Sequence, residues 1–190
     1  MMGARIILAV AALGAAPVLA QSALKNHNTD QPVDVHSDRI ELSDKENRAV
    51  FVGKVHAVQG DMTMDAARMT VAYRKGQGAG ADPEIQRIDA SGGVTVVDPS
   101  ERAKGSFGIY DLDRRLITLI GNVALTRGTN TVNGARLVID LNTGRSTVDG
   151  NAVGAPVGSA PAAGGRVTGH FTVPKHNNTT SSPAATTPPK

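Results

Sequence analysis

The sequence predicts an all-β domain of stacked strands because it combines an internal repeat, an alternation of apolar and polar residues, and regularly spaced turns. Residues 51–71 (FVGKVHAVQGDMTMDAARMTV) and 119–139 (LIGNVALTRGTNTVNGARLVI) align without a gap, 68 positions apart. A broken copy lies between them at 90–98 and 105–111. Repetition of one supersecondary unit fixes an architecture, because each unit buries its apolar face against its neighbours. The unit here is strand, glycine turn, strand.

The two complete copies share small and polar residues at fixed positions. Between these positions apolar residues replace apolar residues, as at Phe51/Leu119 and Met69/Leu137. The identical positions are Gly53/Gly121, Val55/Val123, Gly60/Gly128, Thr63/Thr131, Ala67/Ala135 and Arg68/Arg136.

The expected strands follow one another from about residue 30 to residue 150. Apolar residues at every second position lie on one face of a strand and the polar residues on the other. Clusters of turn-forming residues separate the strands at 43–47, 59–61, 98–100, 111–113, 127–129 and 142–144, with a Gly-rich break at 76–83. In order, the apolar residues that mark the strands are Val33, Val35, Ile40 and Leu42; Phe51, Val55 and Ala57; Met62 and Met64; Met69, Val71 and Tyr73; Ile85 or Ile88, Val94 and Val96; Phe107 and Ile109; Ile117, Leu119, Val123 and Leu125; Val132, Leu137, Ile139 and Leu141.

Residues 1–20 predict a cleavable secretory signal peptide. Arg5 precedes an apolar run at 6–16, Pro17 interrupts it, and Val18 and Ala20 occupy the −3 and −1 positions of a cleavage site. The chain contains no cysteine, so neither a disulfide nor lipid attachment to a cysteine is expected. From these features we expect the mature protein in a bacterial periplasm.

Beyond residue 150 the composition shifts to Gly, Ala, Pro, Ser and Thr. Such a segment buries too little apolar surface to order itself, so residues 151–190 are expected to form a disordered, low-complexity tail. The segment RVTGHFTV at 166–173 keeps apolar residues at even spacing and is either one more strand or part of the disordered tail.

Composition argues against several classes of function. The chain has 20 Lys and Arg against 17 Asp and Glu, with three Phe, two Tyr and no Trp, which does not favour a nucleic-acid-binding face. The five histidines lack the spacing of metal ligands, so neither a metal nor another cofactor is expected. There is no cysteine nucleophile, no G-x-S-x-G and no phosphate-binding loop. We therefore expect no enzymatic activity.

The repeat resembles a known family. FVGKV at 51–55 and GNVALTRG at 121–128 resemble the OstA-like repeat of the lipopolysaccharide-transport proteins, and residues 32–53 resemble the lead-in to that repeat. The resemblance covers about residues 30–150 and implies a twisted β-jellyroll that is open along one side. It also implies a periplasmic bridge that carries lipopolysaccharide, its lipid A acyl chains in an apolar slot, from the inner-membrane export complex to the outer-membrane translocon.

The partners that the resemblance implies are lipopolysaccharide, an anchored LptC-like protein, the N-terminal domain of an LptD-like translocon, and further copies of the chain joined head to tail. Since a stack of strands has unpaired edges at its ends, Val33, Val35 and Leu141 are the candidate partner-edge residues. The candidate slot residues are Phe51, Val55, Met62, Met64, Met69, Val94, Val96, Phe107, Ile109, Leu119, Val123, Leu125, Leu137 and Ile139.

Two other functions stay open on the sequence. The chain could be an LptC-like component that keeps its N-terminal segment as an anchor, or a structural or adhesion module with a solid core. Met62, Met64 and Met69 suit a lipid slot and a solid core alike, because unbranched Met side chains fill irregular apolar space of either kind.

Overall fold

The computed structural model describes residues 27–76, 83–150 and 165–172. All regular structure in these residues is β-strand, which confirms the predicted all-β fold. Within the same residues, no helix is long and apolar enough to cross a membrane. The signal peptide predicted at 1–20 and most of the tail predicted at 151–190 lie outside the described residues.

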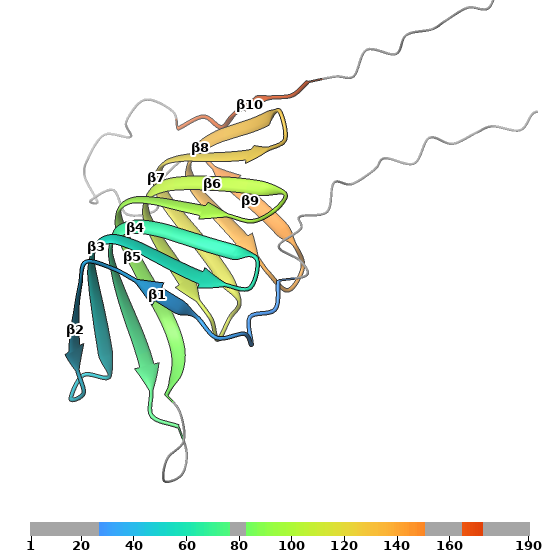
Figure 1. The fold of residues 1–190 in the computed structure, drawn as a ribbon. Helices are drawn as coiled ribbons and strands as arrows, with labels where there is room; N and C mark the ends of the chain where they lie inside the picture. The colour runs from blue at the N-terminus through green and yellow to red at the C-terminus, as the bar shows by residue number, and fades with distance from the viewer. Residues whose placement is uncertain (1–26, 77–82, 151–164, 173–190) are drawn as a thin grey trace, which may run out of the picture.

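The strands of the described residues form one ten-stranded antiparallel sheet (Figure 1). The long strands β3 to β8 are consecutive hairpins, β1 and β2 both pair with β3, and β9 and β10 both pair with β8. The strands are β1 (Asp34–His36), β2 (Arg39–Ser43), β3 (Arg48–Gln59), β4 (Met62–Arg74), β5 (Glu84–Val97), β6 (Glu101–Asp111), β7 (Leu116–Arg127), β8 (Asn130–Asp140), β9 (Arg145–Asp149) and β10 (Thr168–His170).

Each long strand bends near its middle, where its pairing with a neighbouring long strand shifts register. In β3, β5 and β7 the bend falls on two successive residues with positive φ: Gly53–Lys54, Gly92–Gly93 and Gly121–Asn122. Glycine adopts this conformation without steric cost, and asparagine tolerates it. Gly53 and Gly121 therefore mark a corner inside a strand, which the sequence analysis did not anticipate, whereas Gly60 and Gly128 lie in the hairpin turns that it expected.

The corners fold the sheet into two layers. Layer 1 contains β2, β9 and the half-strands between them, from 48–52 of β3 to 136–140 of β8. Layer 2 contains β1, β10 and the other half-strands, from 55–59 of β3 to 130–134 of β8. Figure 1 shows the two sets of strands diverging from their shared corner. This open antiparallel arrangement is the predicted jellyroll.

The core lies between the two layers. Within each layer, on either side of the corner, paired inward residues form rows that run across the strands. Burying each large aliphatic side chain contributes roughly 1.5–3 kcal/mol. The main row of layer 1 is Ala49, Val71, Ile88, Tyr110, Ile117 and Ile139. The main row of layer 2 is Ala57, Met64, Val96, Ala103 and Leu125.

Candidate functional site

The candidate site is the apolar interior between the layers. The pleat of each strand directs every second side chain into it. Most sequence-predicted slot residues are buried there, and Phe51 is half-buried against them. The buried residues are Val55, Met62, Met64, Met69, Val94, Val96, Leu119, Val123, Leu125, Leu137 and Ile139.

Phe107 and Ile109 lie on the outer face of layer 1, so the prediction that they face the interior is wrong. Phe107 is 57% exposed, and Ile109 lines an outer groove. The register of β6 shifts between Lys104 and Phe107, and such a shift reverses which residues of the strand point inward. Gly108 and Tyr110 therefore face the interior in their place.

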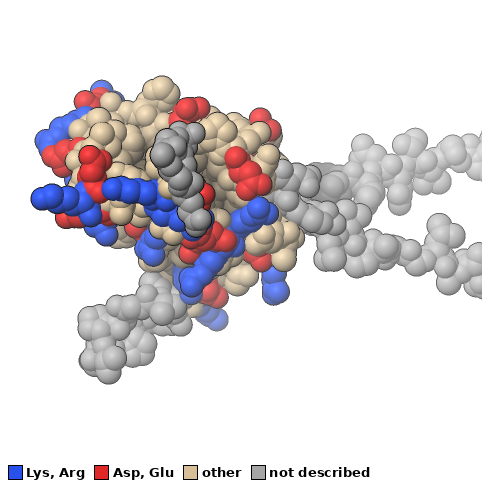
Figure 2. All heavy atoms as spheres, turned by 90° about the horizontal axis from the view of Figure 1, so that it is seen from below, with Lys and Arg blue, Asp and Glu red and all other residues tan. Residues whose placement is uncertain are grey.

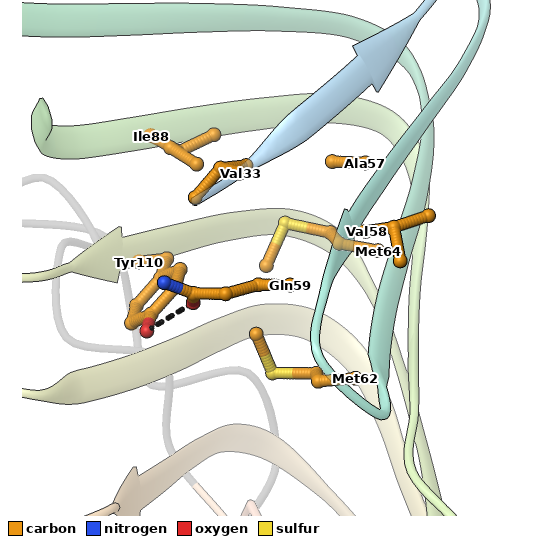
Figure 3. A pocket seen from close by; sticks show the side chains of 8 residues that line it. All are labelled: Val33, Ala57, Val58, Gln59, Met62, Met64, Ile88 and Tyr110. Carbon is orange, nitrogen blue, oxygen red and sulfur yellow. Dashed lines mark hydrogen bonds between the residues drawn. The ribbon is translucent and has the colours of Figure 1, made fainter. Parts of the chain in front are cut away.

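The interior is closely packed where Figure 3 shows it. The cavity there has a volume of ≈ 10 Å³, and its lining includes Val33 from the segment before β1, Met64 from layer 2, and Ile88 and Tyr110 from layer 1. A cavity of this volume holds about one water molecule at most. An acyl chain could occupy this region only if the layers, or the side chains between them, moved apart.

A row of polar residues lies at the hairpin tips of layer 2, away from the corner. We call it the polar rim: Gln59, Asp98, Glu101 and Arg127. Gln59, Asp98 and Glu101 are the buried polar residues found in the described chain. Polar groups at this depth need hydrogen-bond partners, and two members of the rim find theirs in layer 1.

Gln59 and Tyr110 form the first bridge between the layers. The Tyr110 hydroxyl donates a hydrogen bond to Gln59 Oε1 over 2.8 Å, between residues 51 positions apart in the chain. Burial raises the pKa of Tyr110, Arg115 lowers it and Asp30 raises it further, with burial the largest of the three effects. The hydroxyl therefore stays protonated and remains a donor at physiological pH.

Glu101, Arg127 and Ser146 form the second bridge. Arg127 Nε donates to Glu101 Oε2, and Arg127 Nη2 donates to Ser146 Oγ over 2.9 Å. The side chain of Glu101 is only 2% exposed, whereas that of Arg127 is 30% exposed. Since Ser146 belongs to β9, Arg127 joins the rim of layer 2 to the last strand of layer 1.

Sequence reasoning missed both bridges, although the repeat contains a signal for them. Gln59 and Arg127 are equivalent positions, because each directly precedes the shared hairpin glycine, Gly60 or Gly128. In both copies a polar residue follows an inward apolar position at the spacing of the strand. Continuing the alternation by one more step would therefore have predicted that Gln59 and Arg127 face inward, at the same point of each copy.

At the N-terminal end of the sheet, inward-facing apolar residues are left uncovered. Ile40 and Leu42 of β2 extend the inward rows of layer 1, yet they are 51% and 68% exposed. The edge candidates Val33 and Val35 lie at this end, half-buried against the core, and Val35 is in β1.

At the C-terminal end, β9 and β10 cover both halves of β8. The edge candidate Leu141 is 3% exposed and belongs to the core, so its placement at a free edge is wrong. The reason is that β9 returns beside β8 and removes the edge that the sequence analysis expected there. The segment predicted as either strand or tail at 166–173 contains β10, whose residues are exposed.

Charged residues of both signs are interspersed on the face in Figure 2. Several form exposed pairs, including Arg74 with Glu84 and Arg87 with Asp89. His56 Nδ1 lies 2.6 Å from Asp65 Oδ1 on the outer surface. In the described residues, no group of three or more His, Cys, Asp or Glu side chains is placed to hold a metal ion.

Residues 34–145 match the family described as "LptA/(LptD N-terminal domain) LPS transport protein". A protein of Rhizobium meliloti (strain 1021), itself described as uncharacterized, is 36% identical over 155 residues, which cover 75% of this chain and 83% of that protein.

The fold is also found in a solved structure. The crystal structure of LptH from Pseudomonas aeruginosa superposes with a TM-score of 0.62 and 20% identity, covering 76% of this chain and 98% of that one. LptH is described as the LptA-homologous periplasmic component of the lipopolysaccharide transport device. At this level of identity the likeness supports the fold alone.

Proposed function

Because the chain belongs to the LptA/(LptD N-terminal domain) LPS transport family, we propose that it is a non-enzymatic periplasmic carrier of lipopolysaccharide. In this function, it receives lipid A from the inner-membrane export complex and passes it toward the outer-membrane translocon. The acyl chains travel between the two layers, and the sugars stay outside the open side of the jellyroll.

The observation that carries this proposal is the continuous apolar inner face. Both main rows run from strand to strand across the sheet and contain no charged side chain. Each CH₂ group removed from water contributes about 0.8 kcal/mol, so exposing one chain of ~12 carbons costs on the order of 10 kcal/mol. A lipid with several such chains requires a continuous dry path, and the rows of Val, Ile, Leu, Met and Ala, with the single Tyr110, would line one when the layers part.

The proposed assembly is head to tail. Strand edges at the two ends can pair with the ends of other jellyrolls, which would extend the inner face from one copy to the next. Such a heterologous contact does not close on itself, so it can lengthen into a bridge. An LptC-like anchored protein and an LptD-like N-terminal domain would occupy the two ends of that bridge.

One observation favours the second candidate, a structural module with a solid core. The cavity in Figure 3 is ≈ 10 Å³, which leaves no room for a chain in this state of the molecule. The two candidates therefore differ in whether the interior opens to lipid.

Photo-methionine tests this difference without altering a side chain's size. Met62, Met64 and Met69 are at most 3% exposed and line the interior, so each becomes a light-activated probe there. The carrier predicts adducts with purified lipopolysaccharide at these three positions, mapped by mass spectrometry. Polysaccharide stripped of lipid A is the control and should give none. Adducts confined to neighbouring protein side chains would favour the solid-core module.

A further inference from the structure

The segment that precedes the first strand crosses the mouth of the jellyroll. We call residues 27–33 the strap. Its residues have no strand pairing, and most of their side chains are exposed. Val33, at its end, is half-buried and lines the cavity together with Met64 of layer 2 and Ile88 and Tyr110 of layer 1 (Figure 3). The strap therefore covers the same interior that the proposed function assigns to acyl chains.

One side chain holds most of the strap in place. Gln59 Nε2 donates to the backbone oxygens of Thr29 and Gln31, over 2.9 and 2.8 Å. Gln59 Oε1 accepts from Tyr110 Oη over 2.8 Å and contacts His27 Nε2 at 3.0 Å. A glutamine amide has two donors and two acceptor sites, so this one is saturated. Gln59 thus links the strap, the rim of layer 2 and the wall of layer 1.

The strap also reaches layer 1 on its own. Arg115, in the turn after β6, places Nη2 3.4 Å from Asp30 Oδ1. Both side chains are largely exposed, so this ion pair is weak and exchanges readily with water. The strap is consequently fastened to both layers, mainly by polar contacts that water can replace once they separate.

The corner on the far side of the molecule is built differently. There each long strand continues from one layer into the other. In β3 and β7 it does so through two successive residues with positive φ, Gly53–Lys54 and Gly121–Asn122. The layers can therefore separate only on the side of the strap and rim. Behind the strap, Met62 and Met64 present flexible side chains that adapt to an irregular apolar ligand.

We propose that the strap and Gln59 form a latch over an acyl-chain entrance, and that the latch must release before lipid reaches Met62 and Met64. The ligand class is the acyl chain of a lipopolysaccharide-type lipid, and the inference rests on the proposed carrier function. Tyr110 is a positioning residue, since its hydroxyl holds the Gln59 amide toward the strap.

The first test opens the latch. Gln59→Leu removes all four polar contacts and puts an apolar side chain of similar size at the rim. The initial rate of photo-methionine capture of purified lipopolysaccharide at Met62 and Met64 should rise about fivefold or more. This is the factor that corresponds to the net stabilisation from roughly one hydrogen bond. Gln86→Leu is the matched control, because Gln86 bonds Asp113 on the exposed surface and not the strap. Equal initial rates for the two variants would overturn the latch.

The second test closes the latch and keeps Gln59. The chain has no native cysteine, so Asp30→Cys/Arg115→Cys can be joined by a cleavable bis-maleimide across the mouth. Capture at Met62 and Met64 should fall in the joined protein and return when the linker is cleaved. Undiminished capture in the joined protein would refute the latch and leave the carrier function standing. If lipopolysaccharide is captured at no interior methionine in any form, linked or free, the carrier function itself fails.

Discussion

The two ends of the folded sheet are built alike and completed differently. Each end has a five-residue strand in layer 1 and a three-residue strand in layer 2: β2 and β1 at one end, β9 and β10 at the other. At the first end the inward rows of layer 1 stop on Ile40 and Leu42, which are exposed. At the second end they stop on Val148, which is half-buried, and Ser146, which binds Arg127.

This difference shows that the chain satisfies one of its ends by itself and leaves the other unsatisfied. Covering exposed apolar side chains on an inward row removes apolar surface from water, which favours binding of a partner there. The end formed by β1 and β2 thus suits a partner, whereas the end formed by β9 supports the fold. We expect substitutions at the β9 end to lower the stability of the fold. Substitutions at the end formed by β1 and β2 should instead weaken association.

The largest effect should come from the bridge at the C-terminal end. Arg127→Met leaves the buried Glu101 carboxylate without this cation, which should lower the free energy of unfolding by about 2–3 kcal/mol. Urea denaturation measures it. Arg74→Met is the control, because both side chains of its pair with Glu84 are exposed, 53% and 57%, so its loss should change the stability far less. Equal losses in the two variants would contradict a structural role for this bridge.

The short strands of layer 2 should also differ. Deleting residues 27–36 uncovers Gln59 and Tyr110 and should cost about 1–2 kcal/mol, because buried polar groups lose their partners. Deleting residues 165–190 removes β10, whose residues are all exposed, and should cost less than about 0.5 kcal/mol. Thermal and urea unfolding of the two truncated proteins compare them directly. A larger loss from the second deletion would reverse the comparison.

A charge at the N-terminal end should affect association more than folding. Leu42→Asp places a carboxylate on the uncovered inward row, and burying it at a contact should weaken self-association at least about tenfold. Unfolding should change little, because Leu42 is already 68% exposed. Sedimentation over a concentration series measures the association. Asn122→Asp, at the exposed corner of β7 away from both ends, is the control. If it weakens association as much, then the effect comes from added charge in general and not from a contact at the β2 end.

The smallest effect concerns pH at the turn between β8 and β9. Hydrogen bonds from Thr143, the largest cause, and from Asn142 lower the pKa of Asp140 below its usual 3.8, against a smaller opposing effect of burial. A lowered pKa in the folded state stabilises the protein above pH 3.8, and this contribution disappears as pH falls through the lower folded value.

We therefore expect Asp140→Asn to be slightly less stable than the native chain at neutral pH, by no more than about 0.5 kcal/mol. The difference should vanish in acid, where Asp140 is protonated in both folded and unfolded chains. Urea denaturation at a series of pH values from 7 down to 2 checks this. Asp44→Asn, in the turn between β2 and β3, is the control, and a difference that persisted in acid would argue against the Asp140 carboxylate as its source.

The repeat accounts for both what sequence reasoning found and what it missed. Leu119, Val123, Leu137 and Ile139 were placed inward correctly, because their spacing survives the corner of β7 and matches the shift in β8. Phe107 was misplaced because continuous alternation ignores the shift in β6. The cross-strand row shows that Phe107 lies at the same level as Arg68 and Arg136, which are outward positions in the repeat. Reading the broken copy in that register would have turned Phe107 outward.

By itself, the sequence determined the all-β class, the hairpin turns, the repeat and most of the apolar inner face, because period-two alternation and turn chemistry are local properties of a strand. Only the tertiary structure decided that Gly53 and Gly121 bend strands, that β9 covers Leu141, and that Gln59 meets Tyr110. These features depend on how half-strands distant in the chain face one another. The spacing of residues along one strand cannot show which side chain of layer 1 will hydrogen-bond to a residue of the polar rim.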